Sequence, residues 1–385
     1  MSRLISRRRN AATLTFLTTG ALLLAACSST PSSGTSTTTA GAPETSSSSP
    51  TSAASEDANL ALHKDMSPAD GAVDVDTSKY KTDKTALKIG YVDMGLVNSW
   101  RVQALGSAKI VAQQLGVELI PTDAGGDATK EISDAEDVLA SGVDALLVSP
   151  VSPDSIVPIV ERAYASGIPV IIWGSDVNTD KYTAKVVSDD EFFGLAGGQQ
   201  LVKDLNGKGN VIMLRGIAGN STETARYNGA VKAFEGTEIK IVGEDYGDWA
   251  FDKGKAIAEN LVAANPQIDG VWSSGAAMTE GAVEAFQEAG RPLVPMTGEN
   301  LNGFFKIAEQ VGLKTVAPQF PTWQAPEAVK LAVRALRGLP FKNNYLLKPP
   351  AVTDIAGSVL PDVSDDYWVE NYLTKDQILQ VFPTK

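Results

Sequence analysis

The stretch LKIGYVDMGLVNSWR, residues 87–101, joins a short apolar run to a segment whose apolar residues recur at helical spacing. The apolar run, 87–92, predicts a buried strand, and residues 100–115 predict a helix. The turn between them carries an amide, a hydroxyl, an indole and a guanidinium in four consecutive positions, Asn98 to Arg101. A strand-to-helix turn needs only turn residues and a cap. The additional groups indicate one wall of a binding site.

The same alternation of short apolar runs and helical segments continues along the chain. Further strands are expected at 117–122, 144–150, 168–174, 184–188, 209–214, 239–246, 270–273, 293–297 and 314–317. The segments between them have apolar residues at helical spacing. Alternating strands and helices predict an α/β fold with parallel sheets covered on both faces.

The alternation also repeats itself within the chain. VDALLVSP, 143–150, matches IDGVWSSG, 268–275, and the pair Asn98-Ser99 matches Asn220-Ser221. Gly167 and Gly174 match Gly290 and Gly298, so that all four matches have offsets between 122 and 125 residues. Such a consistent offset predicts two lobes of one architecture.

Two such lobes would form a cleft lined by the loops that follow their strands, because ligands bind outside the carboxyl ends of parallel strands. The loops of the first lobe hold Asp93, Asn98, Trp100, Arg101, Ser149 and Trp173 to Asp176. Those of the second lobe hold Arg215, Asn220 to Thr222, Asp245 to Trp249, Ser273-Ser274, Glu299 and Asn300.

The candidate loops are rich in amides, hydroxyls and indoles and contain few basic groups. A phosphate or carboxylate ligand would favour arginine clusters or a glycine-rich helix start. No GxGxxG or GxxxxGK[ST] pattern occurs. This inventory suits a small neutral polyhydroxy compound, whose C–H faces stack on indoles while polar groups bind its hydroxyls.

Several of these residues have a structural alternative. Asn98 could cap the helix that follows it. Trp100, Trp173 and Trp249 could be core residues, and Arg101 could be a solvated surface charge. Glu299 could cap a helix or be solvated. Two further tryptophans, Trp272 and Trp368, are interpreted as structural.

The first 26 residues have the features of an export signal. Four arginines, at positions 3, 7, 8 and 9, precede the 14-residue apolar run 11–24, which is too short to span a bilayer permanently. The run ends in LAAC, 24–27, which resembles a bacterial lipobox and implies cleavage before a lipidated Cys27. An ordinary secretory signal is the alternative. SRRR loosely resembles a twin-arginine signal, so the export route stays open.

Residues 27–84 are expected to carry the lipid anchor and to form a flexible tether rich in Ser, Thr and Pro. Within this stretch, residues 56–83 are more mixed in composition, which fits either a tether or a segment ordered against the domain. Without its first 26 residues the chain has 29 Lys and Arg against 46 Asp and Glu, a net charge of −17. Such an acidic chain is a poor nucleic-acid binder.

The chain has one cysteine and one histidine, His63. With Cys27 lipidated and His63 ahead of the folded region, serine–histidine catalysis, cysteine–histidine catalysis and Cys- or His-based metal sites lack their residues. We therefore expect no metal and no cofactor.

These features resemble the periplasmic sugar-binding proteins of the ribose-binding type, which serve ATP-binding-cassette (ABC) importers. The resemblance rests on GIAGNSTETARYNGAVKAF (216–234), VDALLVSP, GIPVI (167–171) and NSWR (98–101), and spans about 87–347. It implies the type I periplasmic binding protein fold, two doubly wound parallel-sheet lobes joined by a three-crossing hinge. The crossings are expected near 188–189, 319–320 and 345–348. The lobes then comprise 85–188 with 320–346, and 189–319 with 347–385.

The resemblance also implies binding residues. The family's first-loop contacts correspond to Asn98, Trp100 and Arg101, and its hinge glutamine corresponds to Gln319. Its remaining contacts correspond to Ser149 in place of asparagine, to Trp249, and to Glu299 in place of aspartate. Together with Trp173, Asp176 and Asn220, these are the expected ligand-binding residues.

Three positions depart from the family's pattern. Its Asp–Arg pair is Gly174-Ser175 here, with Asp176 one residue later, and its Asn–Asp pair is Gly275-Ala276. Its sugar-binding arginine corresponds to Thr224, with Arg226 close by. These departures argue against ribose itself and leave room for another sugar or for an acyclic tetritol or pentitol.

The sequence thus predicts a monomeric, non-enzymatic lipoprotein on the extracytoplasmic face of the cell membrane. It would capture a small neutral sugar or polyol and deliver it to an ABC permease and its ATPase. One alternative is the same architecture binding a nucleoside, an amino acid or a signalling furanose. Another is a glycosidase that uses carboxylates from among Asp93, Asp176, Asp245 and Glu299.

Overall fold

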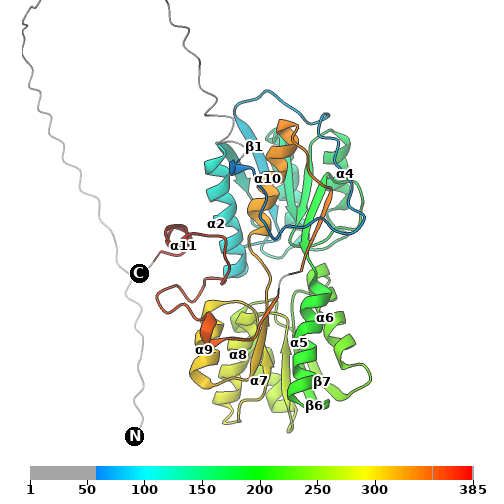
Figure 1. The fold of residues 1–385 in the computed structure, drawn as a ribbon. Helices are drawn as coiled ribbons and strands as arrows, with labels where there is room; N and C mark the ends of the chain where they lie inside the picture. Colours follow the sequence, from blue (N-terminus) through cyan, green and yellow to red (C-terminus); the bar gives the residue numbers. More distant parts are fainter. Residues whose placement is uncertain (1–57, 349, 384–385) are drawn as a thin grey trace, which may run out of the picture. The chain divides into compact units, whose positions relative to one another are not determined.

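The computed structural model describes residues 58–348 and 350–383, which belong to one compact unit (Figure 1). Two six-stranded sheets organise this part of the chain. The predicted signal peptide, Cys27 and the tether up to residue 57 lie outside the described residues. Within the described residues, no helix is both long and apolar enough to cross a bilayer.

The first lobe is built on a sheet with the order β11-β5-β4-β3-β1-β2, in which every neighbouring pair is parallel. Its strands are β1 (Leu87–Asp93), β2 (Val117–Pro121), β3 (Ala145–Ser149), β4 (Val170–Trp173), β5 (Ala184–Ser188) and β11 (Asn344–Leu347). Its helices are α2 (Ser99–Gln114), α3 (Ala128–Ala140), α4 (Val157–Ala165) and α10 (Gln324–Arg337).

The second lobe is built on a sheet with the order β12-β10-β9-β8-β6-β7. Its strands are β6 (Lys208–Arg215), β7 (Glu238–Tyr246), β8 (Gly270–Ser273), β9 (Met296–Thr297), β10 (Thr315–Pro318) and the antiparallel β12 (Ala351–Val352). Its helices are α5 (Asp190–Asp204), α6 (Ser221–Phe234), α7 (Phe251–Ala264), α8 (Ala276–Glu288) and α9 (Asn302–Val311). The last described elements are the short 3₁₀ helix η1 (Ala356–Ser358) and α11 (Lys375–Val381).

Both sheets repeat one topology, in which the first strand of each lobe lies between the second and the third. This is the order of a doubly wound sheet with a switch point beside its first strand. The predicted fold class, two doubly wound lobes of one architecture, is confirmed.

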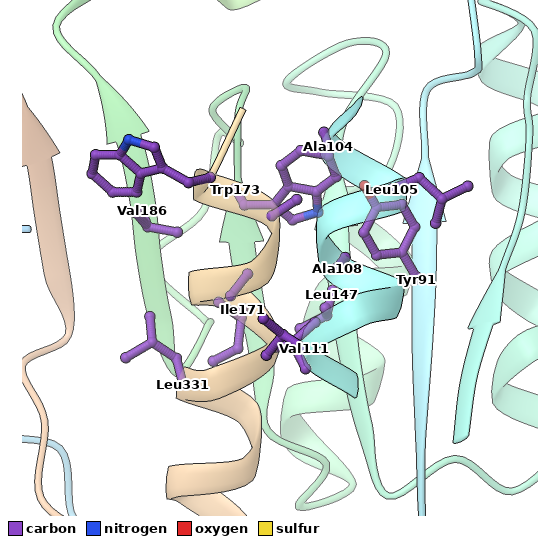
Figure 2. Packing of buried hydrophobic residues seen from close by; sticks show 14 of the residues in the cluster. Tyr91, Ala104, Leu105, Ala108, Val111, Leu147, Ile171, Trp173, Val186 and Leu331 are labelled. Atoms are coloured by element: carbon purple, nitrogen blue, oxygen red, sulfur yellow. The ribbon is translucent and has the colours of Figure 1, made fainter. Parts of the chain in front are cut away.

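The apolar runs form strands because both faces of each sheet are covered by helices. In β3, Leu147 belongs to the core cluster that includes α2 and α10, whereas Leu146 and Val148 belong to the cluster on the opposite face. Figure 2 shows Leu147 and Ile171 packed with Val111 of α2 and Leu331 of α10. Trp272 is fully buried in the corresponding layer of the second lobe, as expected.

The chain passes between the sheets three times, after β5, after β10 and after β11. Figure 1 shows the result for α10, which lies with the first lobe although it follows β10 of the second. The predicted three-crossing hinge is therefore present. Because of these crossings, segments that are far apart in sequence lie together where the strands β5, β10 and β11 end.

Residues 58–84, the described part of the expected tether, are ordered against the domain, which is the second alternative given for 56–83 and moves the boundary of the tether from 84. Leu60, Met66 and Tyr80 are buried in the core cluster of the first lobe. Isolated bridges pair Pro68 with Tyr345 and Asp74 with Lys342. Burial of these three large side chains contributes to holding the segment against the domain.

The C-terminal residues do not all belong to the second lobe, to which 347–385 were assigned. β12 pairs with β10, and η1 packs near α9, but α11 packs on α2 of the first lobe. Gly106 of α2 makes room for this contact, since a Cβ there would lie 2.7 Å from a methyl group of Val381.

Candidate ligand-binding site

A cavity lies where the two lobes, the second crossing and the C-terminal segment meet. It encloses about 430 Å³ of empty space, including its opening to solvent. The cavity is lined by Asn98, Trp100, Arg101, Ser175, Thr222, Arg226, Trp249, Gly275, Ala276, Ala277, Glu299, Phe320 and Trp368.

The first turn of α2 forms one wall. Asn98 is the N-cap of this helix, and its side chain accepts a hydrogen bond from the Arg101 backbone N–H at 3.2 Å. The predicted capping role and a position in the cavity wall therefore coexist. The Trp100 indole donates to the Phe320 carbonyl at 2.8 Å, and the two rings stack with centroids 4.8 Å apart.

Arg101 is buried, so its interpretation as a solvated surface charge is wrong. Its Nη1 donates to Ser149 Oγ at 2.6 Å and lies 3.4 Å from Asp93 Oδ1. Burial raises the pKa of Asp93, while the Arg101 charge opposes that rise. The guanidinium also lies 4.9 Å from the Trp100 ring centroid, so it faces the cavity beside an aromatic face.

Arg226 of α6 is the corresponding group of the second lobe. Its Nε donates to Asp190 Oδ1 at 3.1 Å, and its Nη1 lies 3.2 Å from Glu299 Oε1. The guanidinium also stacks 3.7 Å from the Phe193 ring and 4.4 Å from the Phe320 ring. Burial raises the pKa of Glu299 to about 7 and that of Asp190 to about 6, against the opposing charge of Arg226.

Trp249 forms the aromatic wall contributed by the second lobe. Its indole N–H donates to the Ser274 carbonyl at 3.1 Å and to Ser274 Oγ at 3.0 Å. Its backbone has a φ of 55°, a left-handed conformation that non-glycine residues adopt rarely. Gly216 leaves room for the ring, since a Cβ at that position would lie 2.3 Å from it.

The lobes make direct contacts beside the cavity. Asn220 caps α6 by accepting from the backbone N–H of Thr222, and its Nδ2 donates to the Val151 carbonyl of the first lobe at 3.1 Å. The Ser221 hydroxyl accepts from the Asp176 backbone N–H at 2.8 Å. The cleft between the lobes is therefore closed on this side.

Five of the ten predicted binding residues line the cavity, namely Asn98, Trp100, Arg101, Trp249 and Glu299. The other five do not. Ser149 lies behind Arg101, Trp173 is fully buried in the core, and Asn220 is buried in the contact between the lobes. Asp176 forms an ion pair with Lys185 at 3.0 Å, and Gln319 lines a separate groove next to the hinge.

Several lining residues were missed among the predicted binding residues. Arg226 lies four positions after Thr222 on α6, and this spacing places both on one helix face. Phe320 is the neighbour of the predicted Gln319. Trp368 was interpreted as structural, and no sequence pattern places it beside loops more than 60 residues away.

Comparisons with known proteins agree with this fold. Residues 89–340 match the model of the periplasmic binding protein domain. The xylitol-binding protein of Mycolicibacterium smegmatis is 30% identical over 63% of this chain and 70% of its own. The ribose import binding protein of Bacillus subtilis is 30% identical over 66% of this chain and 81% of its own.

A solved ABC transporter solute-binding protein from Mycobacterium smegmatis, with bound glycerol, is also similar. It is 27% identical, with a TM-score of 0.67 over 72% of this chain and 98% of its own. The family expected from the sequence is confirmed by the matched domain and by the arrangement of the two lobes. The chain belongs to the periplasmic binding protein domain family.

Proposed function

We propose that the protein is the solute-binding component of an ABC importer and captures a small neutral sugar or sugar alcohol in this cavity. The observation that carries the proposal is that both arginines of the cavity are already paired with carboxylates. Arg101 is paired with Asp93, and Arg226 with Asp190 and Glu299. An anionic ligand would have to compete with these carboxylates for the guanidinium groups.

A neutral ligand rich in hydroxyl groups fits such a site. Its hydroxyls can accept from the remaining guanidinium N–H groups and donate to Glu299 or Asn98. Its C–H faces can pack on Trp100 and Trp249, which enter from opposite lobes. Closure of the lobes would then enclose the ligand, with no chemical step.

The relatives support this ligand class. One is named for xylitol and others for ribose, and a solved neighbour holds glycerol. We extend the proposal to tetritols and pentitols because the family's Asp–Arg and Asn–Asp pairs are replaced by Gly174-Ser175 and Gly275-Ala276.

The proposal includes the cellular context inferred from the sequence. The protein acts as a monomer, anchored by a lipid on Cys27 to the extracytoplasmic face of the membrane, and delivers its ligand to a permease and an ATPase.

Cys27→Ser should move the protein from the membrane fraction to the soluble fraction. Retention of this variant in the membrane fraction would contradict the anchor.

The glycosidase alternative has little support. Within the described residues, Glu299 is the only carboxylate among the residues that line the cavity. A typical glycosidase needs two carboxylates flanking the bond that it cleaves.

A thermal-shift screen of the purified protein against sugars, polyols, nucleosides and amino acids tests the proposal. Binding to the native state raises the unfolding midpoint by mass action, and a ligand at 100 times its Kd contributes about 2.7 kcal/mol. We expect neutral sugars or polyols to give the largest shifts. Shifts confined to nucleosides or amino acids would contradict the proposed ligand class.

A further inference from the structure

One wall of the cavity comes from outside the family domain. Residues 365–372, here called the wall segment, follow β12 and η1 and lie beyond residues 89–340, which match the family model. Trp368 of this segment lines the cavity and is only 3% exposed.

The second lobe holds the wall segment by backbone pairing. Trp368 forms an antiparallel bridge with Leu301. On either side of it, the Val369 N–H donates to the Asn300 carbonyl at 2.7 Å, and the Asn302 N–H donates to the Tyr367 carbonyl at 2.9 Å. These partners directly follow Glu299, so Trp368 is fixed relative to the carboxylate of the cavity.

The first lobe holds the same residue through α2. The buried Gln103 amide accepts from the Trp368 backbone N–H at 2.8 Å and donates to the Trp368 carbonyl at 3.0 Å. The Trp368 indole N–H donates to Ser99 Oγ at 3.0 Å. Both lobes therefore fix the position of this side chain.

These contacts determine what Trp368 can offer a ligand. Its indole N–H already has a partner in Ser99, so the rest of the ring presents an apolar surface to the cavity. Such a surface packs on C–H groups and blocks extension of the cavity in its direction. Ser99, Trp100 and Arg101 are consecutive, so Trp368 adjoins the wall formed by α2.

We propose that Trp368 is a specificity-determining residue that contacts the ligand and sets the length of solute that the site accepts. This inference takes its ligand class from the proposed function. The location of the site does not depend on that function. Removing the indole opens the cavity towards the wall segment. The variant then loses contact with the preferred solute and tolerates a longer one better.

The test measures Kd by calorimetry for the wild type, Trp368→Ala and Trp368→Phe. The probes are erythritol, xylitol, sorbitol, ribose, adenosine and glutamine. Tyr367→Phe is the matched control, because Tyr367 is a neighbouring buried aromatic residue that does not line the cavity and loses only its bond to the Glu370 carbonyl.

We expect Trp368→Ala to weaken binding of the best probe at least tenfold, equivalent to about 1.4 kcal/mol. The affinity ratio of sorbitol to erythritol should rise at least threefold. Trp368→Phe should give intermediate values, and Tyr367→Phe should stay within twofold of the wild type.

The inference is overturned if Trp368→Ala and Trp368→Phe both keep wild-type affinities and the wild-type order of preference. It is also overturned if Tyr367→Phe weakens binding as much as Trp368→Phe does, because Trp368 would then act only through the folding of the segment. If adenosine or glutamine is the best probe and loses affinity in Trp368→Ala, the proposed ligand class fails while the role of Trp368 stands.

Discussion

Trp249 and the two arginines illustrate how single residues define the cavity. The guanidinium groups are oriented by buried carboxylates, whereas Trp249 depends on Ser274 and on glycines that let its ring approach the backbone. At Gly275, for example, a Cβ would lie 2.8 Å from the Trp249 ring. The aromatic wall of the second lobe therefore requires small residues around it.

Trp249→Ala should weaken ligand binding at least tenfold, because it removes a large apolar surface that a bound sugar or polyol would contact. The fold should persist, since this side chain is only partly buried. Calorimetric titration with the best compound of the thermal-shift screen measures the effect. Tyr246→Ala is the control, an exposed aromatic residue outside the cavity lining. Wild-type affinity of Trp249→Ala would remove this residue from the site.

The buried carboxyl group of Glu131 leads to a prediction about how the free energy of unfolding depends on pH. Burial raises its pKa to about 8, and its Oε1 accepts from the Val151 N–H at 3.0 Å. Oε2 has no hydrogen-bond partner among the described residues. Between its ordinary pKa of 4.5 and about 8, the folded state retains a proton that the unfolded state has lost. The contribution of Glu131 to the free energy of unfolding should therefore fall as pH rises through this range.

Glu131→Gln should remove this contribution, because the amide keeps the acceptor for Val151 and carries no charge. The full effect of such a shift is on the order of 3–5 kcal/mol. Urea unfolding from pH 5 to pH 8 should show the variant becoming more stable than the wild type by at least about 1 kcal/mol at pH 8. Parallel curves for the two proteins would show that Glu131 does not titrate in this way.

At the scale of elements, α2 and α6 begin in the same manner in the two lobes. Each has an asparagine N-cap, Asn98 and Asn220, at the end of the loop that follows the first strand of its lobe. The two asparagines nevertheless differ in role. Asn98 lines the cavity, whereas the Asn220 amide reaches the first lobe at the Pro150 and Val151 carbonyls.

Substitutions of Asn220 can separate its role as the N-cap of α6 from its contact with the first lobe. Asn220→Ala loses both, and should lower the free energy of unfolding by about 1–2 kcal/mol and weaken ligand binding. Asn220→Ser keeps a good cap but lacks the amide that reaches the other lobe, so its stability should be closer to that of the wild type while its affinity falls. Urea unfolding and calorimetry measure the two effects. Equal affinities for Asn220→Ser and the wild type would show that the contact between the lobes does not support binding.

The sequence predicts elements better than it predicts the cavity. Apolar runs such as 170–173 identify strands because both faces of these strands are buried. Loops after strands identify Asn98, Arg101 and Trp249, because parallel strands end at one edge. This reasoning does not predict Phe320 and Trp368 as cavity residues, because a hinge crossing and a C-terminal segment bring them to the cavity. The same reasoning wrongly includes Trp173, because the last residue of a strand can point into the core.

At the scale of the whole molecule, the three crossings and the wall segment connect the same two lobes. The crossings determine the fold, and the segment around Trp368 adds contacts to both lobes beside the cavity. A ligand held between Trp100 and Trp249 would stabilise the closed arrangement through differential affinity, as linkage requires.

The central claim is that a small neutral sugar or polyol binds in the cavity between the lobes. A crystal structure of the protein with the best compound of the thermal-shift screen tests this most directly. The account predicts a neutral sugar or polyol between Trp100 and Trp249, with hydroxyl groups within hydrogen-bond distance of Arg101, Arg226 or Glu299. A ligand bound instead in the groove lined by Gln319, or a charged ligand that displaces the carboxylate partners of the arginines, would contradict it.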